Sequence, residues 1–128
     1  MSEQPSVFRP GGISYVRIPA PDPDELAAFY AKVFGWSIRR HGDSPAFTDR
    51  SGHVIGHFVR DQSPTADHGI RPYIYVESVV DTIEQALKSG ASVATEPYPE
   101  GNLTVATLRD PAGNTVGIWE QSRITEET

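Results

Sequence analysis

Histidines are the side chains in this chain that most readily bind a metal ion, because the sequence contains no cysteine and so no thiolate ligand or nucleophile. His53 and His57 are four residues apart. On a helix that spacing would join two imidazoles to one ion, but on a strand it separates their α carbons by about 13 Å. We therefore expect no metal ion shared by this pair. His41 and His68 fall in predicted loops, where surface histidines are ordinary.

Aromatic and arginine side chains occupy alternate positions in two segments. Tyr15 and Arg17 belong to the first, and Arg71, Tyr73 and Tyr75 belong to the second. Alternate residues of a strand share one face, and such a face suits a planar ring that carries a carboxylate or phosphate. The sequence offers no Ser-His-Asp order, phosphate-binding loop or dinucleotide fingerprint. The pattern favours binding over these chemistries.

The first segment opens a predicted βαβββ module at about residues 12–60. After a strand at 13–18, a helix is expected with Asp22 as its N-cap, Pro23 in its first position and Gly35 as its left-handed stop. Its apolar stripe follows helical spacing and comprises Leu26, Phe29, Tyr30, Val33 and Phe34. Three short strands are expected at 36–40, 45–49 and 52–60.

The second segment opens a repeat of this plan at about residues 70–120, after a linker at 61–69. A strand at 70–76 precedes a helix that begins at cap Ser78 and stops at Gly90. Its apolar positions are Val79, Ile83, Ala86 and Leu87. Strands at 91–95, 102–109 and 115–120 follow, with a loop at 97–101 and a tail at 121–128. Both modules close on a Gly-x-x-x-Gly segment, at 52–56 and 113–117.

With Phe29-Tyr30, Phe34-Gly35-Trp36 and Asp110-Pro111-x-Gly113-Asn114 in this order, the chain resembles the vicinal-oxygen-chelate superfamily of glyoxalase I, bleomycin-resistance proteins and extradiol dioxygenases. The resemblance covers roughly residues 12–120. It implies a single α+β domain over residues 1–128. In such a domain two βαβββ modules form a cup-shaped, partly open mixed β-sheet with helices on its outer face.

Proteins of this superfamily take metal ligands from the first and last strands of each module. The first-strand positions correspond here to Tyr15 and Arg71. Aligning the two Gly-x-x-x-Gly segments places the last-strand positions at Gly56 and Gly117. None of these is a usual ligand, so we expect no bound metal and no other cofactor.

The resemblance also implies which residues line the cup, once strand alternation is applied. Val16, Ile18, Ile74 and Val76 are expected to face the helices, together with His57 as a structural residue on the Ile55 and Val59 face. The predicted ligand-binding residues are Tyr15, Arg17, Val54, Gly56, Phe58, Arg71, Tyr73, Tyr75, Gly117 and Trp119. A Tyr15 hydroxyl beside Arg71 is a candidate general acid or base. The alternative is that the aromatic residues only fill the interior or a dimer seam.

The composition of the chain argues against two classes of partner, nucleic acids and membranes. Eleven Lys and Arg against 17 Asp and Glu give a formal charge of −6, and the basic residues are scattered, which argues against nucleic acid. No apolar run is long enough for a membrane span, and residues 1–10 lack the apolar core of a signal peptide. We therefore predict a cytoplasmic protein, and by family analogy a homodimer.

Three functions remain open from the sequence. The first is a metal-free protein that binds a small aromatic or anionic metabolite or drug, similar to the antibiotic-sequestering branch of the superfamily. The second is an enzyme, either a metal-dependent lyase, isomerase or dioxygenase, or an acid-base catalyst that uses Tyr15 and Arg71. The third is a non-catalytic interaction module whose cup is filled.

Overall fold

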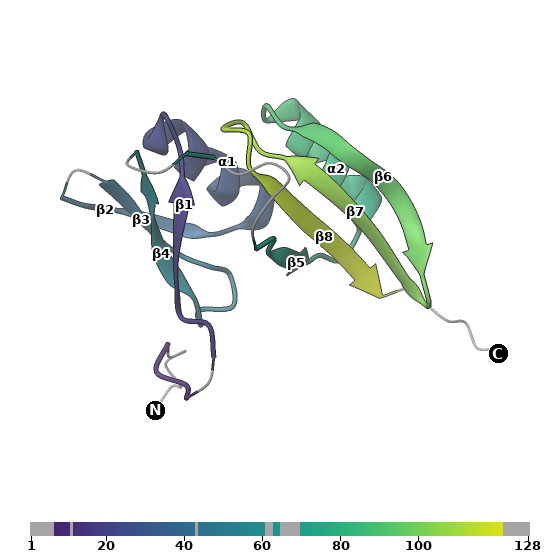
Figure 1. Cartoon of the computed structure of the whole chain (residues 1–128), viewed down its shortest axis with the longest axis horizontal. Helices are drawn as coiled ribbons and strands as arrows, with labels where there is room; N and C mark the ends of the chain where they lie inside the picture. Colours follow the sequence, from purple (N-terminus) through teal and green to yellow (C-terminus); the bar gives the residue numbers. More distant parts are fainter. Residues whose placement is uncertain (1–6, 11, 43, 61–62, 65–69, 122–128) are drawn as a thin grey trace. The chain divides into compact units, whose positions relative to one another are not determined.

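Each half of the sequence builds one four-stranded mixed sheet and one helix (Figure 1). This is seen in a computed structural model that describes residues 7–10, 12–42, 44–60, 63–64 and 70–121. The chain divides into two compact units, Met1–Pro64 and Thr65–Thr128, which we call module one and module two. The predicted α+β class with two βαβββ modules is confirmed.

Module one contains β1 (Tyr15–Pro19), α1 (Pro23–Phe34), β2 (Ser37–His41), β3 (Ser44–Thr48) and β4 (Ile55–Val59). Its strands are ordered β1-β4-β3-β2. The β1–β4 pair is parallel, with α1 as the crossover, and the other pairs are antiparallel. The sheet is open, so β1 and β2 form its edges.

Module two contains β5 (Tyr73–Tyr75), α2 (Val79–Lys88), β6 (Ser92–Glu100), β7 (Leu103–Arg109) and β8 (Thr115–Gln121). The order β5-β8-β7-β6 repeats that of module one, again with one parallel pair, β5–β8. Neither helix in the described part of the chain has the length and apolar character that crossing a membrane requires.

Helix α1 begins and ends where its sequence predicts. The Asp22 side chain accepts a hydrogen bond from the backbone N–H of Glu25 at 3.2 Å, and Pro23 takes the first position, whose N–H would have no helical acceptor. Gly35 ends the helix with φ of 76°, a left-handed conformation that only glycine adopts freely.

Helix α2 receives two caps at its N-terminus. The Ser78 side chain accepts from the N–H of Asp81 at 3.1 Å, as predicted. The Glu120 carboxylate, from β8, accepts from the N–H of Val79 at 2.6 Å. This second cap ties the helix to the sheet beneath it, and its negative charge lies at the positive end of the helix dipole.

The core of each module lies between its helix and one face of its sheet. In module one the core is largely aromatic. Its large buried side chains are Leu26, Phe29, Tyr30, Phe34, Phe47 and Phe58. The Trp36 ring stacks on the rings of Tyr30 and Phe47, with the centroids 4.6 Å apart in each pair. In module two the core is smaller and aliphatic, with Val79, Ala86, Ala106, Leu108, Val116 and Ile118 almost fully buried.

Two segments differ from their predictions. Residues 97–101 were expected to be a loop, but β6 continues to Glu100 through Pro97 and Pro99. Proline is tolerated there because β6 is an edge strand, and its register against β7 shifts twice, between Val93 and Thr95 and again before Tyr98. On α2, Leu87 is 49% exposed although it was assigned to the apolar face.

Candidate functional site

Each sheet has one face that packs on its helix and one that does not, and we call the second the open face. In module one the register gives the open face in two rows across the strands. The first row is Arg17 in β1, His57 in β4, Ala46 in β3 and Arg39 in β2. The second row is Tyr15, Ile55, Thr48 and Ser37. The predicted site residues Tyr15 and Arg17 therefore share a face.

Tyr15 and His57 are in direct contact on this face. The Tyr15 hydroxyl lies 2.9 Å from Nδ1 of His57, and the ring centroids are 5.9 Å apart. Tyr15 is 46% exposed, whereas His57 is half-buried. A second polar contact lies nearby, where Nη1 of Arg39 donates to Oγ1 of Thr48 at 3.2 Å. The open face of module one thus joins a phenol and an imidazole between two arginine positions.

Two of the predicted ligand-binding residues of module one belong to the opposite face. Phe58 is fully buried, and its ring lies 5.8 Å from that of Tyr30 in α1. Gly56 is buried beside Phe47. Strand alternation puts both on the helix side, so their assignment to the cup is wrong. Val54 lies in the hairpin before β4.

The prediction that His57 is a structural residue facing the helix is also wrong. His57 lies on the open face with Tyr15 and Arg17, and not on the side that faces α1. The counterpart of His57 in module two is Gly117. Arg17 and Tyr73 hold equivalent positions in the first strands of the two modules, and they pair with His57 and Gly117 respectively. The hydrogen bonds that end each parallel pair agree: Ala20 donates to Val59 at 2.8 Å, and Val76 donates to Trp119 at 2.9 Å. The last-strand position of module one is thus His57 and not Gly56.

The hairpin before the last strand explains the error. In module one the closing hydrogen bond joins Asp49 N–H to the carbonyl of Val54, whereas in module two it joins Asp110 N–H to that of Asn114. The first turn is one residue longer, so aligning the two Gly-x-x-x-Gly segments shifts β4 by one position. A comparison of the lengths of these two turns could have predicted that His57 lies on the open face. Arg39, which the site prediction omitted, carried no such signal.

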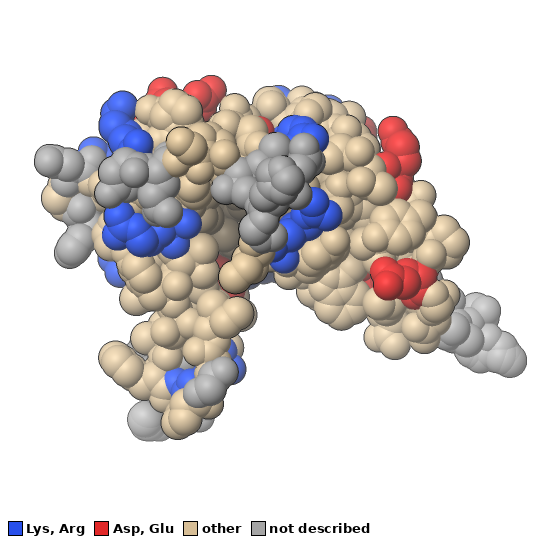
Figure 2. All heavy atoms as spheres, in the orientation of Figure 1, with Lys and Arg blue, Asp and Glu red and all other residues tan. Residues whose placement is uncertain are grey.

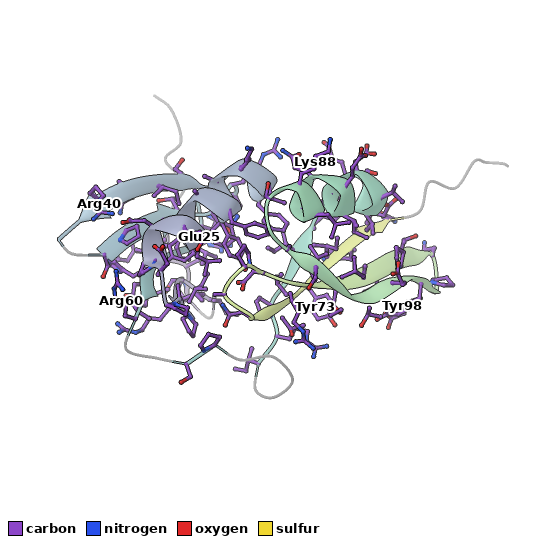
Figure 3. All side chains as sticks on the ribbon, turned by 90° about the horizontal axis from the view of Figure 1, so that it is seen from above. Glu25, Arg40, Arg60, Tyr73, Lys88 and Tyr98 are labelled. Atoms are coloured by element: carbon purple, nitrogen blue, oxygen red, sulfur yellow. The ribbon has the colours of Figure 1, made fainter. Side chains whose placement is uncertain are left out.

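In module two the predicted residues do share the open face. Tyr73 pairs with Gly117, and Tyr75 pairs with Trp119. The Tyr73 ring lies over Gly117, where an added Cβ would be 2.2 Å from ring carbons. Tyr75 and Trp119 meet edge to face, with centroids 4.9 Å apart and planes at 71°. Figure 3 shows Tyr73 and Tyr98 on the side of this sheet away from α2, which carries Lys88.

Charged groups accompany both faces. Arg71 is exposed just before β5, two residues from Tyr73, and Nη1 of Arg109 donates to Oγ1 of Thr115 at 2.8 Å on the same open face. Arg40, on the α1 side of module one, forms an ion pair with Asp24. Figure 2 shows basic side chains on the surface of each module.

The residues at the superfamily's ligand positions do not fit a divalent metal ion. Module one supplies a phenol and one imidazole that are already hydrogen-bonded to each other. Module two supplies a guanidinium at Arg71 and no side chain at Gly117. Metal sites need several convergent oxygen, nitrogen or sulfur donors, and no group of three His, Cys, Asp or Glu side chains occurs within the described ranges.

Three histidines besides His57 remain. His53 lies in the β3–β4 turn, where its backbone N–H donates to Oγ of Ser51 at 3.1 Å. His41 is the last residue of β2. His68 lies outside the described residues, as do most of the predicted linker and the tail from residue 122 onward.

Comparisons with known proteins agree with this architecture. Residues 15–118 match the model of the glyoxalase-like domain family. A glyoxalase/bleomycin resistance protein/dioxygenase family enzyme from Burkholderia phytofirmans PsJN is 23% identical with a TM-score of 0.73, covering 84% of this chain and 97% of that one. A glyoxalase family protein from Bacillus cereus is 16% identical with a TM-score of 0.72, covering 90% and 97%.

A glyoxalase/bleomycin resistance protein from Albidiferax ferrireducens T118 is 19% identical with a TM-score of 0.69, covering 85% of this chain and 98% of that one. These identities are low enough that the solved structures support the fold alone. No functionally curated protein matches the chain. The family match extends from Tyr15 in β1 to Ile118 in β8, which is most of both modules. The chain therefore belongs to the glyoxalase-like domain family of the vicinal-oxygen-chelate superfamily.

Proposed function

We propose that this protein binds a small planar aromatic anion, a metabolite or a drug, on the open face of module two without using a metal ion. The observation that carries the proposal is the group of exposed aromatic side chains there. Tyr73 is 46% exposed and Tyr75 is 56% exposed, and both flank Gly117 and Trp119 in one strand register. Exposed apolar surface gathered in one place commonly marks a binding site.

The arrangement of these rings favours a flat ligand. Because Tyr75 and Trp119 meet edge to face, the contact covers a face of only one of the two rings, whereas stacking would cover a face of each. Gly117 adds no side chain, and its place is taken by the Tyr73 ring. A planar ligand laid against these rings would bury apolar area on both partners and gain an aromatic contact.

The charge of the ligand is inferred from Arg71. This exposed guanidinium precedes Tyr73 by two residues, in a chain whose formal charge is −6. A guanidinium pairs with a carboxylate or phosphate through two parallel hydrogen bonds, which also orients the ligand. Tyr15 and Arg17 of module one stay predicted ligand-binding residues, and the homodimer and the cytoplasmic location stay predictions.

The proposal is tested with 2-naphthoate, a planar bicyclic carboxylate. In a Trp36→Phe background, Trp119 is the only tryptophan, so quenching of its fluorescence reports contact with the ligand. We expect saturable quenching by 2-naphthoate and much weaker quenching by cyclohexanecarboxylate, which keeps the charge but is not planar. Naphthalene-2-methanol, which keeps the ring but has no charge, should bind about tenfold more weakly than 2-naphthoate.

Matched variants separate the two contributions. Tyr75→Ala should weaken 2-naphthoate about three- to tenfold, and Arg71→Ala about tenfold, because each removes one predicted contact. Phe8→Ala and Arg50→Ala remove an exposed aromatic and a turn arginine from module one and should change nothing. Equal affinity for 2-naphthoate and cyclohexanecarboxylate, or equal loss in the control variants, would refute the proposal.

A further inference from the structure

The contact between Tyr15 and His57 has no evident structural purpose. Both side chains project from the open face of module one, away from the aromatic core around Phe47 and Phe58. Tyr15 is 46% exposed, so water competes for its hydroxyl and the hydrogen bond adds little to stability. An imidazole held 2.9 Å from a phenol is nevertheless the geometry that passes a proton from one group to the other.

The surroundings of the pair are suited to an anion. Arg17 is the direct cross-strand neighbour of His57, and Arg39 lies at the other end of the same row, beyond Ala46. Neighbouring strands are about 4.8 Å apart, so the Arg17 backbone lies about that far from the His57 backbone. Arg17 and Tyr15 are two residues apart on one strand face, about 7 Å between α carbons. Arg17 is therefore next to both members of the pair, and it is the group that we assign to a substrate carboxylate.

We propose that Tyr15 and His57 form a proton-transfer pair that enolises a small 2-oxo acid whose carboxylate is held by Arg17. This goes beyond ligand binding on module two and does not depend on it. The Tyr15 oxygen accepts a proton from the carbon next to the carbonyl while the Tyr15 proton passes to Nδ1 of His57. The C–H electron pair forms the enolate double bond, and the carbonyl π pair moves to oxygen.

The step is balanced without an oxidant, a reductant or a co-reactant. The products are the enolate, an unchanged tyrosine hydroxyl and an imidazolium, and the reverse step returns a proton to carbon. Acting as an acid, the same pair donates the Tyr15 proton to an enolate and is reprotonated from Nδ1 of His57. Arg17 does not transfer a proton in either direction. It positions the carboxylate, so its loss should raise the substrate concentration that the reaction needs.

The test measures exchange of carbon-bound hydrogen for deuterium. Pyruvate and phenylpyruvate are incubated with the protein in deuterium oxide, and loss of the proton signal next to the carbonyl is followed by NMR. We expect exchange above the buffer rate. Tyr15→Phe should lower the catalysed rate at least 100-fold, and His57→Gln at least tenfold. Arg17→Ala should raise the apparent KM more than it lowers kcat.

Matched controls are Tyr98→Phe and His53→Gln, which remove the same atoms outside the open face of module one and should keep the wild-type rate. A second readout uses no substrate: the ¹⁵N chemical shift of Nδ1 of His57 should change in Tyr15→Phe, and in neither control. That variant should also keep the thermal midpoint of the wild type, so a lower exchange rate would not reflect loss of the fold.

Three outcomes would overturn the inference. One is the absence of catalysed exchange with both 2-oxo acids. Another is a wild-type exchange rate in folded Tyr15→Phe or folded His57→Gln. The third is an unchanged Nδ1 shift in Tyr15→Phe, which would mean that the hydrogen bond does not exist in solution.

Discussion

Replacing Gly56 with alanine tests the packing of module one directly. Gly56 in β4 pairs with Val16 in β1 and lies on the side that faces α1. A Cβ atom added there would lie 1.9 Å from the backbone oxygen of Val16 and 2.6 Å from two ring carbons of Phe47. Real Cβ atoms essentially never approach other heavy atoms within 3.0 Å. Neither neighbour can easily move away.

The loss of stability in Gly56→Ala depends on whether the two neighbours of the added Cβ can move. The Val16 oxygen belongs to the neighbouring strand, so relief requires β1 and β4 to separate. Phe47 is 1% exposed and stacks on Trp36, so its ring has no free volume to enter. Overpacking of this kind costs typically 1–3 kcal/mol and more when the backbone moves. Alanine's lower unfolded-state entropy offsets about 0.5–1 kcal/mol. We expect a net loss of about 3 kcal/mol in the free energy of unfolding.

The assay is urea unfolding followed by circular dichroism, with thermal melts as a second measure. A loss of about 3 kcal/mol corresponds to a midpoint roughly 12 °C lower for a chain of this size. Gly117→Ala is the matched control, because the atoms nearest to its added Cβ belong to the side chain of Tyr73, which is 46% exposed, and not to the backbone of a neighbouring strand. That variant should lose about 1 kcal/mol or less. The reasoning fails if Gly56→Ala unfolds within about 1 kcal/mol of wild type, or if Gly117→Ala is the less stable of the two.

Two further substitutions test the caps and turns. The Asp110 carboxylate is 3% exposed and accepts hydrogen bonds from the N–H groups of Ala112 and Asn114 at 3.0 and 2.9 Å. Asp110→Ala should therefore lower the unfolding free energy by about 2–3 kcal/mol. Equal urea midpoints for Asp110→Ala and wild type would contradict this. Glu120→Ala should cost about 1–2 kcal/mol by removing the second cap of α2, while the exposed Glu84→Ala, which loses only an i,i+4 contact with Lys88, should cost about 0.5 kcal/mol or less. A larger loss in Glu84→Ala would show that the Glu120 contact is not a cap.

The helices, both of their N-caps and the end of α1 could be predicted because their signals are local, whereas α2 ends at Lys88 with Ser89 as its C-cap and not Gly90. Asp22, Pro23 and Gly35 act within a few residues of themselves, so no knowledge of the sheet is needed to place α1. The second cap of α2 could not be foreseen in the same way. Glu120 is 41 residues from Val79 in sequence, and only the parallel pairing of β5 with β8 brings them together.

Strand β6 shows a different limit. Pro97 and Pro99 argue for a loop in isolation, because proline cannot donate a ladder hydrogen bond. On an edge strand half of the backbone donors face away from the sheet, and shifts of register supply further positions without a partner. Whether a strand lies at an edge depends on the whole topology, so proline content alone misplaces this segment. Such prolines also discourage further strands from pairing at the edge.

The assignment of residues to the open face depends on the strand register, which a single residue in a turn can change. Side chains alternate across a strand, so a one-residue error in register exchanges the whole set of residues on its two faces. For module two the predicted face was correct, because its hairpin from Asp110 to Asn114 was the one recognised. For module one a single extra residue between Asp49 and Val54 moved Gly56 and Phe58 to the helix side and brought His57 beside Tyr15. His57 was thereby interpreted as structural. An interpretation of function from internal repeats should therefore compare the turns before it compares the strands.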